Sequence, residues 1–257
     1  MSDETVSHHG RTTAYRVDDG ASPTVLFVHG SGGERGLWRG QRRLDATTAA
    51  VDLSGHGESD DVDAEAGYET LTAYADDVAA VAAATGASVL CGSSLGGAVA
   101  LHLAIERPDE VGIDGLVLAG TGPRLPVLDD LLRWLRSDFE RAVGFLHEPD
   151  HLFHRADEAT LSASREAMLE TGRIVTERDF RTSHRFDVRD RLDRVDVPSL
   201  AVVGEHDRLT PRRYHETLAE SMPDCDLAVV PDAAHRAMLE RPSAFNDAVA
   251  TLLDSLA

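Results

Sequence analysis

One serine of this chain stands in a pattern suited to nucleophilic catalysis by a hydroxyl group. Ser94 is the centre of GSSLG at positions 92–96, between an apolar run at Ala87–Gly92 and a helical, small-residue-rich stretch at Gly96–Ile105. A strand that turns sharply into a helix holds such a serine in strained geometry with its hydroxyl exposed, and glycines stand where side chains would collide. We therefore predict that Ser94 is a nucleophile. The alternative is an ordinary glycine-rich turn.

A serine hydroxyl needs a general base, and a carboxylate must orient that base. Of twelve histidines, His235 is the predicted base, because it follows the last strand-like run and precedes the last predicted helix. Asp207 is the predicted acid, since it lies just beyond an earlier strand-like run and completes the order serine, aspartate, histidine. His206 and His29 are the alternatives for the base, and Glu205 is the alternative for the acid.

Acyl transfer also needs N–H groups that stabilise a developing oxyanion. The backbone N–H of Leu95 follows the predicted nucleophile and lies at the positive end of a predicted helix. The second donor is expected in the glycine-rich run HGSGG at 29–33, where the backbone can approach a substrate closely. We assign it to the N–H of Ser31, with Gly30 and Gly32 as alternatives. A flexible turn is the other explanation for these glycines.

The pattern along the chain predicts a parallel sheet that positions these residues. Short apolar runs alternate with stretches of helical periodicity, which is typical of an α/β fold with helices on both faces of the sheet. The predicted strands are Thr24–His29, Ala49–Leu53, Ala87–Gly92, Ile113–Ala119, Pro198–Gly204 and Asp226–Val230, after an edge hairpin within Thr5–Val17. The predicted helices are Leu71–Thr85, Gly96–Ile105, Pro211–Ser221 and Arg241–Leu256.

The pattern changes between Gly122 and Asp193, where helical periodicity continues without a buried strand. One predicted helical face carries Leu128, Leu131, Leu132, Leu135 and Phe139. We therefore predict an α/β core formed by residues 1–121 and 194–257, with residues 122–193 inserted as a helical cap. Aromatic residues and arginines are frequent in this insertion, which indicates an apolar pocket that also meets an acidic group.

The chain resembles the α/β-hydrolase fold superfamily from about Thr24 to Leu256. Four blocks carry the resemblance in order and spacing: the HG-x loop at 29–33, DLSGHGES at 52–59, the serine motif at 92–96, and the acid and base blocks at Asp207 and His235. The resemblance implies an eight-stranded, mostly parallel sheet with a helical cap after the sixth strand. It also implies that His56 has a structural role in the loop after the fourth strand.

The segment at 235–242 looks like that of a branch containing enol-lactone hydrolases, meta-cleavage C–C hydrolases and small carboxylesterases. The leading prediction is a serine hydrolase that cleaves a carboxylic ester, lactone or thioester through an acyl-enzyme, with neither a cofactor nor a metal required. C–C bond hydrolysis and cofactor-free perhydrolysis are alternatives on the same triad. Arg236 stands where meta-cleavage hydrolases often carry an aromatic residue, which disfavours C–C bond hydrolysis. A non-catalytic ligand-binding module is the alternative from another class.

The composition is strongly acidic and limits the partners. Acidic residues number 45 against 25 basic ones, the net charge is −20, and the chain has no lysine. Concentrated salt relieves such self-repulsion, because the Debye length falls to about 3 Å at 1 M. We therefore expect a halophilic source. Without a basic stripe, the expected partner is a small-molecule substrate rather than a nucleic acid or an anionic membrane.

The chain also lacks signs of export. The N-terminus has no signal-peptide pattern and no apolar run is long enough for a membrane span, so we expect a soluble, cytoplasmic protein. The two cysteines, Cys91 and Cys225, do not make a disulfide framework. Cys91 ends an apolar run and is expected to be a buried small hydrophobe.

Overall fold

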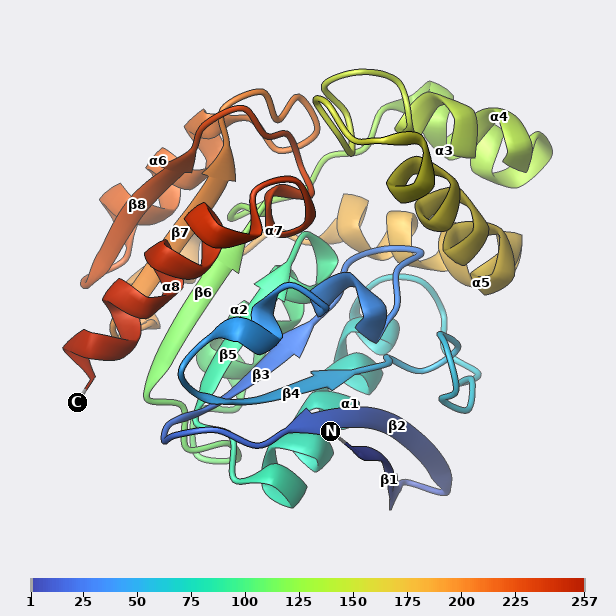
Figure 1. The fold of residues 1–257 in the computed structure, drawn as a ribbon. Coiled ribbons are helices and arrows are strands. Elements are labelled where there is room, and N and C mark those ends of the chain that lie inside the picture. The colour runs from blue at the N-terminus through green and yellow to red at the C-terminus, as the bar shows by residue number, and fades with distance from the viewer. Residues whose placement is uncertain (1, 257) are drawn as a thin grey trace.

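A twisted eight-stranded sheet forms the centre of the computed structural model, which describes residues 2–256 (Figure 1). The strands are β1 Ser2–His8, β2 Arg11–Asp18, β3 Thr24–Val28, β4 Thr47–Val51, β5 Val89–Ser93, β6 Gly115–Ala119, β7 Ser199–Gly204 and β8 Cys225–Val230. Their order across the sheet is β1-β2-β4-β3-β5-β6-β7-β8. The β1–β2 and β2–β4 pairs are antiparallel, and every pair from β4 to β8 is parallel. The predicted edge hairpin and the mostly parallel sheet are confirmed.

Helices cover both faces of this sheet (Figure 1). The α-helices are α1 Tyr68–Thr85, α2 Leu95–Glu106, α3 Asp129–Ser137, α4 Phe139–Leu146, α5 Glu158–Arg185, α6 Arg212–Ser221, α7 Ala237–Glu240 and α8 Pro242–Ser255. Three short 3-10 helices are η1 Arg35–Trp38, η2 Gln41–Arg43 and η3 Arg189–Arg194. The predicted single C-terminal helix at Arg241–Leu256 is thus preceded by a separate short helix, α7, and Pro242 starts the longer one.

The central strands are apolar on both faces because they are buried on both faces. In β3, Leu26 and Val28 pack against residues of α1 and α2, whereas Val25 and Phe27 pack against residues of α8 and η1. Cys91 of β5 is fully buried on the second face, as predicted. Two hydrophobic layers therefore hold the strand ends rigidly in place.

Helices α3, α4 and α5 form an insertion between β6 and β7, named the cap, on the right side of Figure 1. These helices share a small hydrophobic cluster of their own that includes Leu131, Leu135, Val143 and Met168. The predicted face from Leu128 to Phe139 is partly wrong. Leu128 precedes α3 and is 62% exposed, and Phe139 starts a new helix after a break at residue 138.

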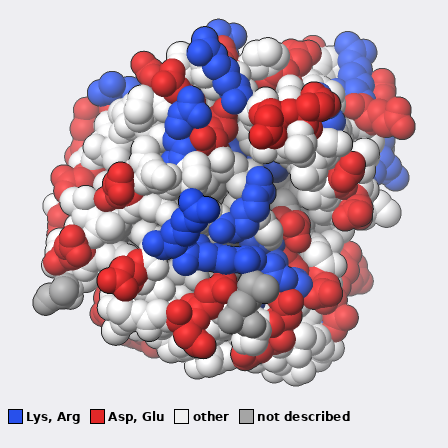
Figure 2. Space-filling model, in the orientation of Figure 1, with Lys and Arg blue, Asp and Glu red and all other residues white. Residues whose placement is uncertain are grey.

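Charge is unevenly distributed over the surface. Figure 2 shows acidic side chains scattered around one face of the molecule and arginines gathered near the centre of that face. Within residues 2–256, the structure contains no helix that is both long and apolar enough to cross a membrane.

Candidate active site

Ser94 occupies a sharp turn at the carboxyl end of a central strand. β5 ends at Ser93, α2 begins at Leu95, and Ser94 between them has a φ of +54° and a ψ of −116°. A positive φ is strained for a residue with a side chain and is retained where the surrounding structure enforces it. The strand–turn–helix context predicted for this serine is therefore present.

Two glycines make this turn sterically feasible. A Cβ on Gly92 would lie 2.3 Å from the backbone oxygen of Gly96, so the strand and the helix can meet only without a side chain there. A Cβ on Gly30 would lie 2.9 Å from the Cβ of Ser94. The loop after β3 therefore packs directly against the serine.

His235 and Asp207 come together at the carboxyl ends of β7 and β8. The Nδ1 atom of His235 lies 2.9 Å from Oδ2 of Asp207, and both side chains are buried. The other carboxylate oxygen accepts the backbone N–H groups of Leu209 and Thr210 at 2.8 and 2.9 Å. The hydroxyl of Thr210 donates to Oδ2 at 2.7 Å and also lies 3.1 Å from Nδ1 of His235. Sequence reasoning missed Thr210, because a threonine after a loop carries no distinctive signal.

Burial alone would raise the pKa of the Asp207 carboxyl group. The neighbouring His235 and the hydrogen bonds from Thr210 outweigh burial and lower that pKa below its ordinary value. Asp207 is therefore ionised near neutral pH. As an anion it can hold a hydrogen on Nδ1 of the imidazole, which leaves the other ring nitrogen free to accept a proton.

The structure places the alternative acid and bases elsewhere. Glu205 is exposed and accepts the backbone N–H of Asp232 rather than pairing with His235. His206 stacks on His154 of the cap. His29 is buried, its Nε2 accepts the N–H of Leu53, and burial lowers its pKa to about 4, so it is neutral and structural.

The loop at 29–33 already uses two of its N–H groups. Gly33 donates to the backbone oxygen of Gly30 at 3.1 Å, and Gly32 donates to Oδ2 of Asp179 at 3.0 Å. Gly32, an alternative in the sequence analysis, is therefore engaged elsewhere. The N–H of Leu95 is the first of α2 and has no intrahelical carbonyl to bind.

Asp179 was not identified from the sequence, and it joins three elements. This carboxylate in α5 accepts hydrogen bonds from Gly32, from the hydroxyl of Tyr74 at 2.6 Å, and from Nε2 of His56 at 2.9 Å. Burial lowers the pKa of His56, but Asp179 more than compensates and raises it above its ordinary value. The pKa of Asp179 is lowered in turn, despite its burial, by His56 and by the hydrogen bonds it accepts. Asp179 and His56 therefore form a buried ion pair, and the structural role expected for His56 is explained.

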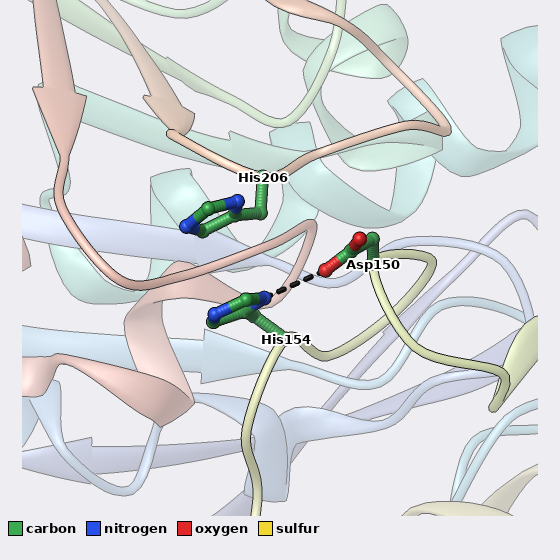
Figure 3. A group of neighbouring side chains, drawn as sticks. All are labelled: Asp150, His154 and His206. Atoms are coloured by element: carbon green, nitrogen blue, oxygen red, sulfur yellow. Dashed lines mark hydrogen bonds and ion pairs between the residues drawn. The ribbon is translucent and has the colours of Figure 1, made fainter.

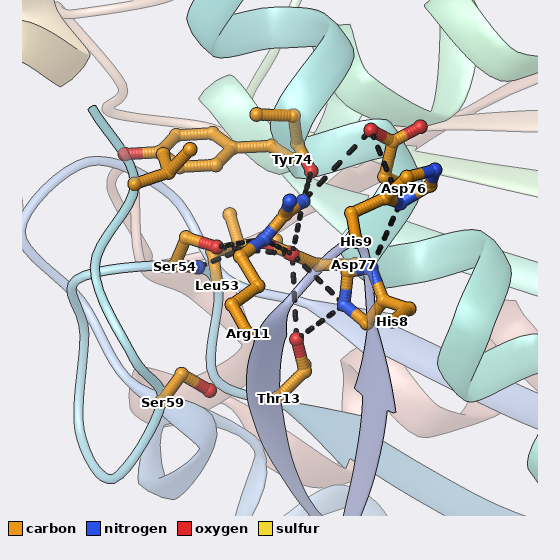
Figure 4. Close-up of polar contacts among 12 residues, drawn as sticks. His8, His9, Arg11, Thr13, Leu53, Ser54, Ser59, Tyr74, Asp76 and Asp77 are labelled. Atoms are coloured by element: carbon orange, nitrogen blue, oxygen red, sulfur yellow. Dashed lines mark hydrogen bonds and ion pairs between the residues drawn. The ribbon is translucent and has the colours of Figure 1, made fainter. Parts of the chain in front are cut away.

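A second buried carboxylate holds the loop that carries His56 (Figure 4). Asp77 of α1 accepts the backbone N–H and the hydroxyl of Ser54 at 2.8 and 3.0 Å. Arg11 of β2 donates to the same carboxylate at 3.0 Å. The loop after β4 is thus fixed by Asp77 on one side and by Asp179 on the other.

A cavity of about 310 Å³ opens above the serine, and both Ser94 and His235 line it. Its wall includes backbone of the glycine-rich loop, the loop after β7, and apolar side chains of the cap such as Leu131, Phe145 and Phe180. Polar and charged side chains share this wall with the apolar ones. A concave site where apolar and polar groups converge is typical of small-molecule binding. Side chains from the helical insertion and Ser94 therefore line the same cavity.

Asp150, His154 and His206 bring potential metal-ligating atoms within 4.8 Å of one another, and no other set of three is found in residues 2–256 (Figure 3). His154 bonds Asp150 at 2.6 Å, and the two imidazole rings are stacked with centroids 3.7 Å apart and planes 9° apart. Ring nitrogens bind ions in the plane of the ring, and stacked parallel rings cannot both point at one ion. The contact therefore joins the cap to the core as a stacked pair.

The strand order, the helices on both faces and the helical insertion after β6 define the α/β-hydrolase class of enzymes. A family model described as the alpha/beta hydrolase family matches residues 25–248, and the chain belongs to this family.

Similar proteins include the pimeloyl-acyl-carrier-protein methyl ester esterase of Neisseria meningitidis serogroup C, which is 32% identical over 86% of this chain and 90% of its own length. A solved structure of a thermophilic esterase is 30% identical and superimposes with a TM-score of 0.87 over 100% of this chain and 98% of its own. An N-acyl homoserine lactone degrading enzyme is 25% identical, with a TM-score of 0.84 over 96% of this chain and 99% of its own.

Proposed function

We propose that this chain hydrolyses a carboxylic ester, lactone or thioester of a small molecule through an acyl-enzyme on Ser94. The observation that carries the proposal is the 2.9 Å contact with the ionised Asp207 made by His235, which lines the same cavity as Ser94. The similar proteins support carboxylic ester hydrolysis, since they are two esterases and a lactone-degrading enzyme.

In the proposed reaction, Ser94 attacks the substrate carbonyl carbon and His235 takes the hydroxyl proton. Asp207 keeps the imidazole in the required tautomer and stabilises the imidazolium that forms. His235 then returns the proton to the leaving group, and water activated by the same histidine releases the acyl group and regenerates the serine.

The N–H groups of Leu95 and Ser31 are the proposed oxyanion donors. Leu95 supplies the first free N–H of α2, next to the nucleophile. The N–H of Gly32 binds Asp179 of α5 and that of Gly33 binds the backbone oxygen of Gly30, which supports Ser31 as the second donor, with Gly30 as the alternative. Residues 122–193 are the proposed cap over this site.

A fluorophosphonate probe tests the proposal directly, because it reacts with activated serines. We expect it to label the wild-type chain at Ser94, and we expect Ser94→Ala to lose both labelling and turnover of p-nitrophenyl butyrate while keeping its circular dichroism spectrum. The neighbouring Ser93 provides the matched control, since Ser93→Ala should still be labelled. Undiminished turnover in Ser94→Ala would exclude the proposed nucleophile. A substrate panel with a vinylogous diketone and with hydrogen peroxide as acyl acceptor separates the C–C hydrolase and perhydrolase alternatives.

A further inference from the structure

Arg236 directly follows the proposed base and is buried beside the proposed active site. The residue is 8% exposed and lines the same cavity as Ser94 and His235. Its guanidinium carbon lies 5.6 Å from the centre of the Phe153 ring. One of its nitrogens, Nη1, donates to the hydroxyl of Ser164 at 2.6 Å. A permanent positive charge is thus held inside the protein, near the reacting groups.

The cap fixes the orientation of this guanidinium through a short chain of hydrogen bonds. Burial lowers the pKa of His147 to about 4, so this imidazole is neutral. Its Nδ1 lies 2.8 Å from the backbone oxygen of Val143 and therefore carries the hydrogen. Its Nε2 must then accept from the hydroxyl of Ser164 at 2.7 Å, which leaves the Ser164 oxygen to accept from Arg236. These partners are all neutral, so they orient the charge of Arg236 without compensating it.

No carboxylate lies within ion-pair distance of Arg236 among the residues that the structure describes. Other well-buried arginines behave differently: Arg35 pairs with Asp52, Arg11 with Asp77 and Arg178 with Asp61. In a chain with 45 acidic residues, a partner for Arg236 would be easy to supply. An uncompensated buried charge is costly, and proteins retain it where it has a function.

Arg236 is charged at neutral pH. Burial, with a smaller contribution from Arg39, lowers the pKa of its guanidinium to about 10 although Glu34 acts to raise it, and this value is still well above 7. A second, smaller cavity of about 70 Å³ also borders Arg236, beside Gly33, Leu37 and Ser164. Arg236 therefore borders two cavities, and Ser164, to which its Nη1 donates, lines the second one.

We propose that Arg236 binds a free carboxylate of the substrate, so that the preferred substrates are esters or lactones that carry a carboxylate away from the bond that is cleaved. Guanidinium groups match carboxylates in shape and charge. The net charge of −20 disfavours polyanions, which makes a single carboxylate a better ligand than a phosphate. The inference rests on the proposed function, because it assigns the substrate class of the same site.

The test compares half-esters of dicarboxylic acids with neutral esters of matched length. The substrates are monomethyl glutarate, adipate and pimelate against methyl pentanoate, hexanoate and heptanoate, and the readout is the ratio of their kcat/KM values. A charge-assisted hydrogen bond predicts that the wild type favours the half-ester by about ten- to a hundredfold at one or more lengths. Arg236→Met should lower that ratio at least about tenfold, and Arg236→Lys should keep an intermediate ratio.

Two control variants separate this site from general electrostatics. Arg213 also lines the cavity but is exposed, so Arg213→Met should change the ratio less than about threefold. Glu34 lines the smaller cavity and is a nearby acid, so Glu34→Gln should leave the ratio equal or higher. A lower ratio in Glu34→Gln would mean that Arg236 serves an internal pair and would overturn the inference.

The outcomes distinguish this inference from the proposed function. A wild-type ratio at or below one at every length, or an unchanged ratio in Arg236→Met, would overturn the carboxylate site while ester hydrolysis stands. If Arg236→Met fails to fold, the wild-type series and Arg236→Lys still test whether Arg236 binds a substrate carboxylate. Absence of turnover for all esters, together with absence of phosphonate labelling at Ser94, would instead contradict the proposed function.

Discussion

The carboxylate of Asp179, in helix α5 of the cap, accepts the backbone N–H of Gly32 at 3.0 Å in the loop that packs against Ser94. The same carboxylate is paired with His56 from the loop after β4. One buried side chain of the cap therefore fixes the loop proposed to hold the second oxyanion donor. Helix α5 therefore contributes to the shape of the proposed site.

The first prediction concerns the substitution Asp179→Asn. An amide cannot accept from Gly32, Tyr74 and His56 together, and it leaves the imidazolium of His56 without its counter-charge. Breaking a buried ion pair costs about 3–5 kcal/mol of unfolding free energy. Displacement of the oxyanion loop should lower kcat about tenfold or more, since losing a donor altogether costs about 100- to 1,000-fold. Urea denaturation and ester kinetics measure the two effects.

Asp77→Asn is the matched control for that variant. Asp77 is equally buried and also paired, but it contacts Ser54 and Arg11 rather than the loop at 29–33. Its replacement should destabilise the fold to a comparable extent while kcat falls much less. If both variants lower kcat equally, the link between Asp179 and the oxyanion loop has no catalytic consequence.

The second prediction concerns the pH dependence of the pair of His56 and Asp179. The pKa of His56 is raised above its ordinary 6.5, so its stabilising effect is complete below pH 6.5 and is lost as the pH rises through the raised value. The pKa of Asp179 is lowered below 3.8, so its effect is present above that pH and is lost as the pH falls through the lowered value. The pair therefore stabilises the fold most between about pH 4 and 6.5.

Comparison with His56→Gln isolates this effect from other titrating groups. The difference in unfolding free energy between the wild type and His56→Gln should be larger at pH 5.5 than at pH 9. Urea denaturation at a series of pH values provides the measurement. A difference that does not vary between those two pH values would show that His56 is neutral in the folded protein.

Local patterns along the chain were enough to predict the sheet, its covering helices and the turn at Ser94. Those features depend on apolar runs and on glycines that interact with residues close to them in the sequence. The proximity of Asp207 and His235 also followed, because the carboxyl ends of parallel strands share one edge of a sheet.

Long-range polar contacts were not predictable in the same way. Asp179 is one of 45 acidic residues and lies 147 positions from Gly32, so nothing in its surroundings along the chain marks it as buried. The missing partner of Arg236 is visible only when the packing around it is known. The break between α3 and α4 was also missed, because Leu128 and Phe139 fit the helical period of α3 although Leu128 precedes that helix and Phe139 starts the next one.

The third prediction concerns salt. Among the residues that the structure describes, the exposed carboxylates without an ion-pair partner include Asp45, Asp63, Asp109, Glu170 and Asp254. Replacing all five by their amides reduces the negative charge by five and should raise the unfolding free energy in 0.1 M KCl, by a few tenths of a kcal/mol for each change. The gain should shrink in 2 M KCl, because screening removes the repulsion that the changes relieve. A gain that is the same at both concentrations would exclude self-repulsion as its cause.

The fourth prediction concerns the turn at Ser94. A Cβ on Gly92 would lie 2.3 Å from the backbone oxygen of Gly96, and backbone on both sides leaves no flexible group to move. Gly92→Ala should therefore lower the unfolding free energy by about 1–3 kcal/mol or more and abolish phosphonate labelling of Ser94.

Gly144 is the matched control, since it lies exposed in α4 with nothing within 4 Å of an added Cβ. Gly144→Ala should stabilise the protein by about 0.5–1 kcal/mol and keep the labelling, because alanine loses less entropy in a helix. Equal labelling of both variants would show that the tight turn is not what activates the serine.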